Sequence, residues 1–194
     1  MGRLGPIDEC SGNILKPDLL LGKNDQDITM DNPLTLTLSQ QDMIDLSWLG
    51  GLLDGEGSFN LHWKRECGRT GKKIHLQVRM GNTNPEIVSE YIRLLKKFDI
   101  GFYQYTQQPK KHHKVAIVIC VNRMKSVLNL CKLVYPYLRG KRAHCYFVIN
   151  YIESRIKRAE HKYNVPYSDD EVEWMNKLRV VNVKGVRDCI SSEK

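Results

Sequence analysis

The most informative segment of the chain is Leu49-Gly50-Gly51-Leu52-Leu53-Asp54-Gly55-Glu56-Gly57-Ser58-Phe59. It joins a region of helical apolar spacing to a region of strict alternation, and two acidic residues stand among glycines at the junction. The glycines at 50, 51 and 55 are poor helix formers, each costing up to about 1 kcal/mol relative to alanine. Such glycines are explained where another backbone approaches closely, so the stretch predicts a helix that packs tightly against a second helix.

Upstream of this stretch, the sequence predicts a helix from Ser39 to about Asp54. Ser39 followed by Asp42 resembles a capping box with Asp in place of Glu. Four leucines then follow at helical spacing, namely Leu46, Leu49, Leu52 and Leu53. Residues 1–38 contain three prolines and show no sustained period, so we expect an irregular N-terminal arm there.

Downstream, two strands are predicted from alternation. Over 58–64, Phe59, Leu61 and Trp63 alternate with polar residues, and over 74–80 the apolar residues are Ile74, Leu76, Val78 and Met80. Alternation indicates one buried and one exposed face. The polar, basic stretch 65–73 between the strands is predicted to be a hairpin loop.

The rest of the chain repeats the strand-strand-helix unit. We expect a helix from Pro85 to Phe98, strands over 102–108 and 115–121, and helices over 123–135, 142–162 and 168–179. This order predicts an α+β fold in which helices lie on one face of a four-stranded antiparallel sheet. The predicted domain spans 39–184, and residues 185–194 form a C-terminal tail.

The composition limits the possible partners of the chain. Its 194 residues contain 30 Lys and Arg against 22 Asp and Glu, a net charge of +8, which favours a polyanion such as nucleic acid. No apolar run approaches the roughly 18 residues of a membrane span, and no secretory signal opens the chain, so we expect a soluble intracellular protein. The six cysteines form no C-x-x-C pair, which argues against a structural zinc site or a disulfide framework.

The polar face of the first predicted hairpin contains no acidic residue. Arg, Lys, Asn and Gln are the side chains that read base edges, and a two-stranded ribbon fits the major groove of DNA. The alternative is an ordinary solvated sheet face that happens to be basic. The residues predicted to read bases are Asn60, His62, Lys64, His75, Gln77 and Arg79, with Gln104 and Gln107 on the third strand. Those predicted to contact phosphates from the loops are Arg65, Arg69, Lys72, Lys73, Lys110, Lys111 and Lys114.

The stretch 49–59 resembles the LAGLIDADG motif of homing endonucleases almost position for position. The family's Ala is Gly50 here, and its second Asp is Glu56. Residues 82–86 and 136–142 are similar to two further family segments, and the resemblance extends over most of 40–180. It implies the αββαββα LAGLIDADG fold with a DNA-binding sheet, here with an extra C-terminal helix. It also implies a homing endonuclease that hydrolyses both strands of a long target in double-stranded DNA.

The resemblance implies a set of catalytic residues. Glu56 would bind Mg²⁺ together with Gly55, and Mn²⁺ or Ca²⁺ are candidate substitutes in binding; a carboxylate is a hard oxygen ligand of the kind Mg²⁺ prefers. Asn82, or Thr83 if the alignment shifts by one, and Lys141 would lie near the scissile phosphate. Asp54 would orient the helix end. The alternatives are an exposed turn carboxylate for Glu56 and a surface lysine for Lys141.

A single copy of the motif implies a homodimer, because monomeric relatives carry two copies. Symmetry then predicts a pseudo-palindromic target of which each subunit reads half. The dimer interface is predicted at Leu49, Gly50, Gly51, Leu53 and Asp54. The resemblance further implies intron homing, in a prokaryotic cytoplasm or an organelle that carries the intron. The alternatives are an RNA maturase, with host intron RNA as a partner, a non-cleaving DNA-binding regulator, or a basic structural module.

Overall fold

The structure, a computed structural model, describes residues 38–65, 72–107, 114–159 and 165–182. The predictions for the N-terminal arm 1–37, for Arg69, Lys110 and Lys111, and for the tail 185–194 lie outside these residues.

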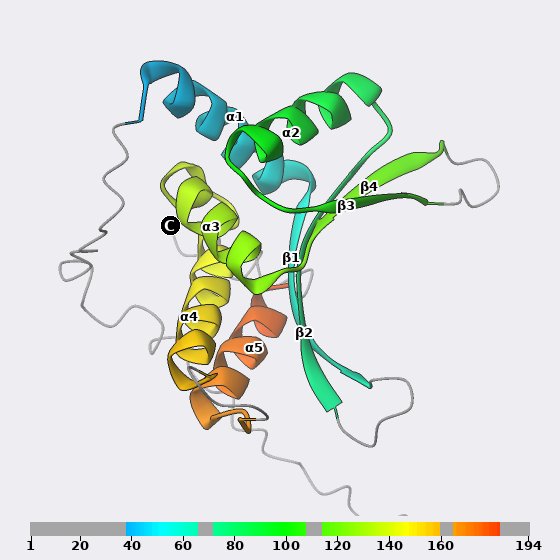
Figure 1. Ribbon diagram of the computed structural model, residues 1–194. Coiled ribbons are helices and arrows are strands. Elements are labelled where there is room, and N and C mark those ends of the chain that lie inside the picture. Colours follow the sequence, from blue (N-terminus) through cyan, green and yellow to red (C-terminus); the bar gives the residue numbers. More distant parts are fainter. Residues whose placement is uncertain (1–37, 66–71, 108–113, 160–164, 183–194) are drawn as a thin grey trace, which may run out of the picture. The chain divides into compact units, whose positions relative to one another are not determined.

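The order of helices and strands confirms the predicted αββαββα arrangement, with further helices at the C-terminal end (Figure 1). The elements are α1 (Gln40–Glu56), β1 (Gly57–Arg65), β2 (Lys72–Asn82), α2 (Pro85–Lys97), β3 (Tyr103–Gln107), β4 (Ala116–Val121), α3 (Met124–Val134), the 3₁₀ turn η2 (Tyr135–Tyr137), α4 (Arg142–Ala159) and α5 (Asp169–Val181).

Capping side chains begin three of the helices, including the one predicted at Ser39. Ser39 and Asp42 form a reciprocal capping box at α1, and Ser168 and Glu171 form one at α5. Asn84 caps α2, whose first residue is a proline. The carboxyl end of α1 differs from the prediction, since the helix continues to Glu56. Because β1 starts at once with Gly57, helix and strand meet without an intervening turn.

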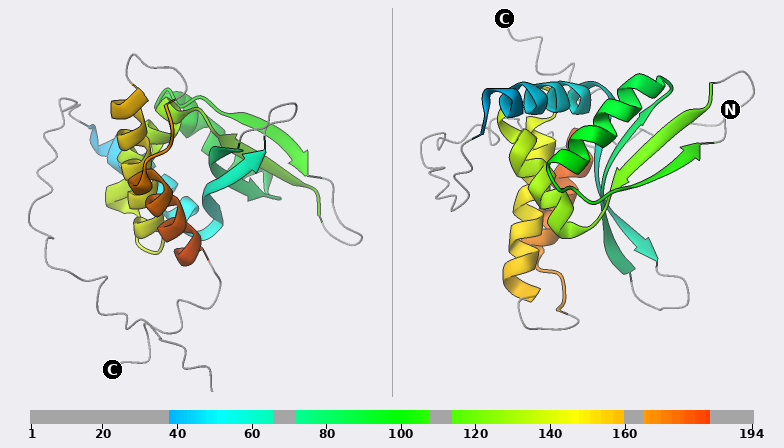
Figure 2. Two further views of the ribbon diagram at one scale, coloured as in Figure 1. Left: turned by 90° about the horizontal axis from the view of Figure 1, so that it is seen from below. Right: turned by 45° about the horizontal axis from the view of Figure 1, so that its top comes forward.

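The sheet is antiparallel throughout, with the strand order β1-β2-β4-β3. Its two hairpins, β1–β2 and β3–β4, join through the central β2–β4 pair, and their tips diverge (Figure 1). The helices lie on one side of the sheet, which leaves its other face uncovered by helices (Figures 1 and 2).

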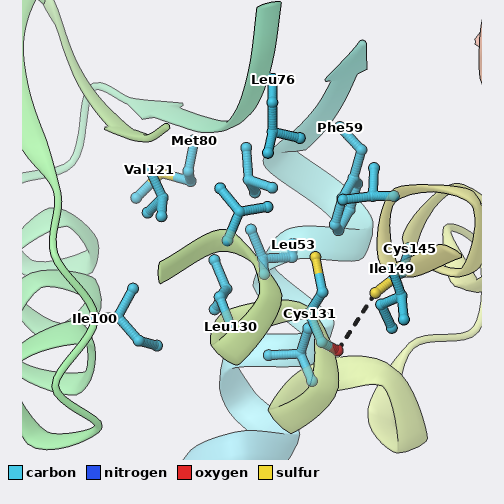
Figure 3. Close-up of a cluster of buried hydrophobic side chains, with 14 of the residues drawn as sticks. Leu53, Phe59, Leu76, Met80, Ile100, Val121, Leu130, Cys131, Cys145 and Ile149 are labelled. Atoms are coloured by element: carbon cyan, nitrogen blue, oxygen red, sulfur yellow. Dashed lines mark hydrogen bonds between the residues drawn. The ribbon is translucent and has the colours of Figure 1, made fainter. Parts of the chain in front are cut away.

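One hydrophobic core lies between the sheet and the helices. It takes side chains from every layer, including Leu53 of α1, Phe59 of β1, Met80 of β2 and Leu130 of α3 (Figure 3). Cys131 and Cys145 belong to this core, whereas Cys120, which is also buried, pairs with Arg79 and Tyr103 and lies on the other face of the sheet. Within the described residues, no helix combines the length and apolar character that a bilayer crossing requires.

The C-terminal helices support the β1–β2 hairpin from behind. The hydroxyl of Tyr167 accepts a hydrogen bond from the backbone N–H of Ile74 at 3.0 Å, and its ring packs edge-on against Trp63. At the other end of α5, Asn182 donates to the carbonyl of Phe59. Helices α4 and α5 are joined by the buried carboxylate of Glu171, which pairs with Arg155 and Arg158. The hairpin is therefore anchored at two points along its length.

Candidate active site and nucleic-acid interface

Two carboxylates close the carboxyl end of α1, in different surroundings. Asp54 accepts hydrogen bonds from the backbone N–H groups of Arg139, Gly140 and Lys141 at 2.6, 3.1 and 2.8 Å. It thereby fixes the turn that leads into α4. Glu56, the last residue of the helix, is exposed. The role expected for Asp54 is sharpened: it orients the start of α4 against the end of α1.

The ammonium of Lys141 lies among the backbone carbonyls around Glu56. Its Nζ donates to the carbonyl oxygens of Leu53 at 3.0 Å, Gly55 at 3.3 Å and Gly57 at 2.6 Å. Gly55 belongs to the last turn of α1, where backbone carbonyls lack partners inside the helix and the helix dipole favours a cation. The structure thus brings Lys141 and Glu56 together, from positions far apart in the sequence.

The oxygen atoms at this end of α1 suit a hard divalent cation. The carboxylate of Glu56 and the carbonyl of Gly55, which belongs to an exposed residue, are oxygen ligands of the kind that Mg²⁺ takes. Of the three carbonyl oxygens that accept hydrogen bonds from Lys141, that of Gly55 lies farthest from Nζ, at 3.3 Å. Among the described residues, no three His, Cys, Asp or Glu side chains group as a metal site. Within the described residues, Glu56 is the exposed carboxylate at this end of the helix.

Asn82 lies at the end of β2 and is partly engaged. Its side-chain oxygen accepts a hydrogen bond from the N–H of Asn84 at 2.8 Å, in the turn that leads into α2. The register pairs it with Ile117, on the same face as the core residues Met80 and Ile119. The amide therefore has a structural task in the turn, and its predicted catalytic role stays a prediction, as does that of the exposed Thr83.

The face of the sheet away from the core collects the predicted base-reading residues. Ser58, Asn60, His62 and Lys64 pair directly with Arg79, Gln77, His75 and Lys73, so all eight point to one side. Neither these positions nor any other position in the four described strands is acidic. Lys114, before β4, is also exposed. Arg65 and Lys72 pair at the end of the hairpin.

Two histidines lie opposite each other at the middle of this face. The ring centroids of His62 and His75 are 5.1 Å apart. Burial first, and then the nearby His62 and Lys64, lower the pKa of His75. His75 is therefore largely neutral at pH 7, and Lys64, Lys73 and Arg79 contribute positive charge to this face.

The third strand corrects one prediction and adds residues that were missed. The register places Gln107 on the polar face with Tyr103 and Tyr105, whereas Gln104 pairs with Ile119 and lies on the opposite face. We therefore remove Gln104 from the DNA-binding set. Alternation alone could have shown this, because residues three apart in a strand point to opposite sides. Tyr103 and Tyr105, which are 43 % and 40 % exposed, were not predicted, because the prediction considered only amide and basic side chains as base-reading residues.

Four of the five residues predicted for the dimer interface are engaged within the chain itself. Leu49 and Leu53 are fully buried in the chain's own core, so they have no surface to offer a partner. Gly50 lies against η2, where an added Cβ would come within 2.8 Å of the Cβ of Tyr137. Asp54 is engaged by the turn at 139–141. Gly51 alone of the five has open space in front of it.

The exposed face of α1 is apolar in its own right. Ile44 is 55 % exposed and Trp48 37 %, and Gly51 and Gly55 continue this face with open space around them. These four residues, here called the α1 stripe, follow helical spacing of four, three and four. Because the opposite side of α1 is in the core, the helix is apolar on both sides. A helix of this kind is normally covered on both sides.

Comparison with known proteins places this fold. No protein-family model matches the chain, and no curated protein does. Among solved structures, the homing endonuclease I-CvuI, in complex with its target in the presence of Ca, matches with a TM-score of 0.55 at 17 % identity over 78 % of this chain and 96 % of its own. The archaeal intron-encoded homing endonuclease I-Vdi141I, complexed with DNA, gives 0.56 at 14 % identity over 75 % and 88 %.

A third structure shares the fold over part of its length. The LAGLIDADG homing endonuclease I-GzeII, in complex with a DNA target, matches with a TM-score of 0.50 at 12 % identity, over 72 % of this chain and 44 % of its own. The chain therefore has the LAGLIDADG homing-endonuclease fold, and the predicted fold class is confirmed.

Proposed function

We propose that this chain is a site-specific homing endonuclease. Two copies form a homodimer, each copy reads half of a long pseudo-palindromic target in double-stranded DNA, and the dimer hydrolyses both strands to initiate intron homing. The observation that carries the proposal is the corner at the end of α1. There, the exposed Glu56 stands between Gly55 and Gly57, whose carbonyl oxygens accept hydrogen bonds from the ammonium of Lys141. The four described strands next to this corner contain no acidic residue.

The proposed cofactor is Mg²⁺, held by Glu56 with a carbonyl oxygen of the helix end. When bound, it would neutralise phosphate charge and assist the attack of water on the phosphodiester. The chain's own residues supply the rest. Lys141 brings a positive charge to the place where negative charge develops on the phosphate oxygens. The sheet face, with Lys64, Lys73 and Arg79, holds the duplex.

The second carboxylate that such a site needs would come from a second copy of the chain. Among the described residues of one chain, Glu56 is the carboxylate exposed at this end of α1, and the α1 stripe is an apolar surface that leads directly to it. Packing two α1 helices along their stripes would cover both and would bring two Glu56 side chains together. Glycines at 51 and 55 let the backbones approach closely. The chain spans nearly all of I-CvuI and less than half of I-GzeII, a relation expected if two copies do the work of one longer chain.

A cleavage assay tests the nuclease proposal directly. The substrates are duplexes from intron-free copies of candidate host genes, incubated with the full chain and Mg²⁺. Wild-type chain is expected to cut both strands at one site. Glu56→Gln should lower the cleavage rate by a factor of about 10³ or more while DNA affinity stays within a few-fold, because affinity comes mainly from phosphate and base contacts.

The matched control for this assay is Glu86→Gln, which removes another exposed carboxylate near the end of the sheet. It should cleave at the wild-type rate. Equal cleavage by Glu56→Gln and wild type would remove Glu56 from the mechanism. Tight, specific binding without cleavage by wild type, on DNA or on intron RNA, would instead favour a DNA-binding regulator or an RNA maturase.

Self-association is tested by Gly51→Leu. The leucine would enter the space that the α1 stripe keeps for a partner, so the variant should sediment as a monomer with an unchanged circular dichroism spectrum. Ser89→Leu, which adds the same side chain to the exposed surface of α2, should remain a dimer. A wild-type monomer that cuts both strands with unimolecular kinetics would contradict the dimer.

A further inference from the structure

The side chains of β3 hold two of the residues expected to read bases from β2. Nη2 of Arg79 donates a hydrogen bond to Oε1 of Gln107 at 2.9 Å. The guanidinium carbon of Arg79 also lies 5.9 Å from the ring centroid of Tyr105, within the range of a cation–π contact. Although β4 separates the two strands in the sheet, the long side chain of Arg79 spans it. The guanidinium is therefore held in one orientation before any ligand arrives.

The contact with Gln107 leaves Arg79 able to recognise a base. A guanidinium has five N–H donors, and Gln107 takes one, so four remain. Two adjacent donors suffice for the bidentate contact to O6 and N7 of guanine, the commonest specific contact of arginine in the major groove. An arginine fixed in this way loses less conformational entropy on binding than a free one.

Gln77 is held in the same manner by Tyr103. Its Nε2 donates to the tyrosine hydroxyl at 3.0 Å, which leaves the second N–H and the side-chain carbonyl free for a ligand. An amide N–H together with a carbonyl is the pair that recognises N7 and N6 of adenine. The rings of Tyr103 and Tyr105 are nearly parallel, with centroids 6.3 Å apart, so the two supports also restrain each other.

The spacing of the two held residues fits neighbouring base pairs. Gln77 and Arg79 lie on one face two residues apart, which is about 6.6 Å along a strand. Bases along one DNA strand are spaced by about 3.4 Å, so the two side chains would meet bases about two steps apart. On β1, by contrast, Asn60 bonds to the hydroxyl of Ser58 within its own strand and has no such cross-sheet support.

We infer that β3 sets the specificity of the sheet: Gln107 and Tyr105 hold Arg79 to read a guanine, and Tyr103 holds Gln77 to read an adenine about two base pairs away, in each half-site. The inference rests on the proposed function, because it assumes that this face enters a major groove. Gln107, Tyr105 and Tyr103 are positioning residues, and they act through the two side chains that touch the bases.

The test is selection from a pool of randomised DNA duplexes by the full-length chain in the presence of Ca²⁺. Arg79→Ala and Gln77→Ala identify the positions that each residue reads. At the first position, Gln107→Ala should lower the preference for guanine about tenfold while the affinity for unselected duplex stays within about twofold. At the second position, Tyr103→Phe should lower the preference for adenine about threefold.

The matched control comes from the same strand. Gln104→Ala removes the same side chain from the opposite face and should retain the wild-type preferences. Full guanine preference in Gln107→Ala, or an equal loss in Gln104→Ala, would overturn the inference and leave the nuclease proposal standing. If wild-type chain enriched no sequence at all, the proposed function would fail, and this inference with it.

Discussion

The two ends of helix α1 each carry two carboxylates, and the surroundings of the two pairs differ. At the amino end, Asp42 and Asp45 both contact the ammonium of Lys97 at 2.7 Å. At the carboxyl end, Asp54 is held by three backbone N–H groups, whereas no hydrogen bond or ion pair to the carboxylate of Glu56 occurs within the described part of the chain. Three of the four acids therefore stabilise the fold, and the fourth is available to a ligand.

The largest effect on stability is expected from Asp54→Ala. Its removal leaves the N–H groups of the turn 139–141 without their acceptor, and hydrogen bonds to charged groups contribute about 1.5–3 kcal/mol each without being additive. We expect a loss of about 3 kcal/mol in the free energy of unfolding, measured by urea denaturation. Because the same turn positions Lys141, cleavage should also fall. Wild-type stability in this variant would mean that the turn does not depend on Asp54.

A smaller loss of stability, and no loss of chemistry, is expected from Asp45→Ala. Asp45 is 5 % exposed and binds Lys97 and Gln41, so its removal leaves polar partners in a partly buried place. The free energy of unfolding should fall by about 2 kcal/mol. Cleavage, assayed at a temperature where the variant is folded, should match wild type. A specific loss of cleavage would contradict the view that the acids at the amino end of α1 stabilise the fold and take no part in the chemistry.

The pH dependence of stability offers a finer test of the amino end. Hydrogen bonds from Lys97, and then from Ser39, lower the pKa of Asp42 from 3.8 to about 2. A carboxyl whose pKa is lowered in the folded chain stabilises it fully above pH 3.8, and this contribution disappears as the pH falls toward 2. The difference in unfolding free energy between wild type and Asp42→Asn should therefore shrink over that interval. A constant difference would contradict the assignment.

The smallest expected change in stability comes from Glu56→Gln, even though its effect on cleavage is the largest. The side chain is exposed, and surface substitutions of this kind shift the free energy of unfolding by no more than about 0.5 kcal/mol. Thermal unfolding of the variant and of wild type should therefore coincide. A marked loss of stability would show that Glu56 is a structural acid like Asp54.

Most of the fold could be predicted from the sequence, because patterns among neighbouring residues indicate most of its helices and strands. Alternation in β1 and β2 and the capping boxes at Ser39 and Ser168 are properties of neighbouring residues. The helix end at Glu56 was missed by two residues, because its continuation depends on β1 starting at once. The order of the strands in the sheet was not predicted, because no local sequence pattern indicates that β4 pairs with β2.

The residues of the candidate site could be proposed from the sequence, but their contacts could not. Glu56 was proposed from the motif and Lys141 from the similar segment 136–142, yet no sequence pattern shows which carbonyls hold Lys141. The burial of two residues expected at the dimer interface could not be predicted for a related reason. Leu49 and Gly51 lie two positions apart in a helix, and only the packed core shows that one faces inward and the other outward.

The contact between Asp54 and the turn at 139–141 also has a consequence for the order of folding. Its partners are 85 to 87 positions apart in the chain. At synthesis rates of about 5–20 residues per second, α1 leaves the ribosome roughly 4–17 seconds before the turn that completes its carboxyl end. During that interval the helix lacks Tyr137, which lies against Gly50 in the folded chain. A chain whose synthesis stops before residue 139 therefore contains the motif but lacks the turn whose N–H groups bind Asp54.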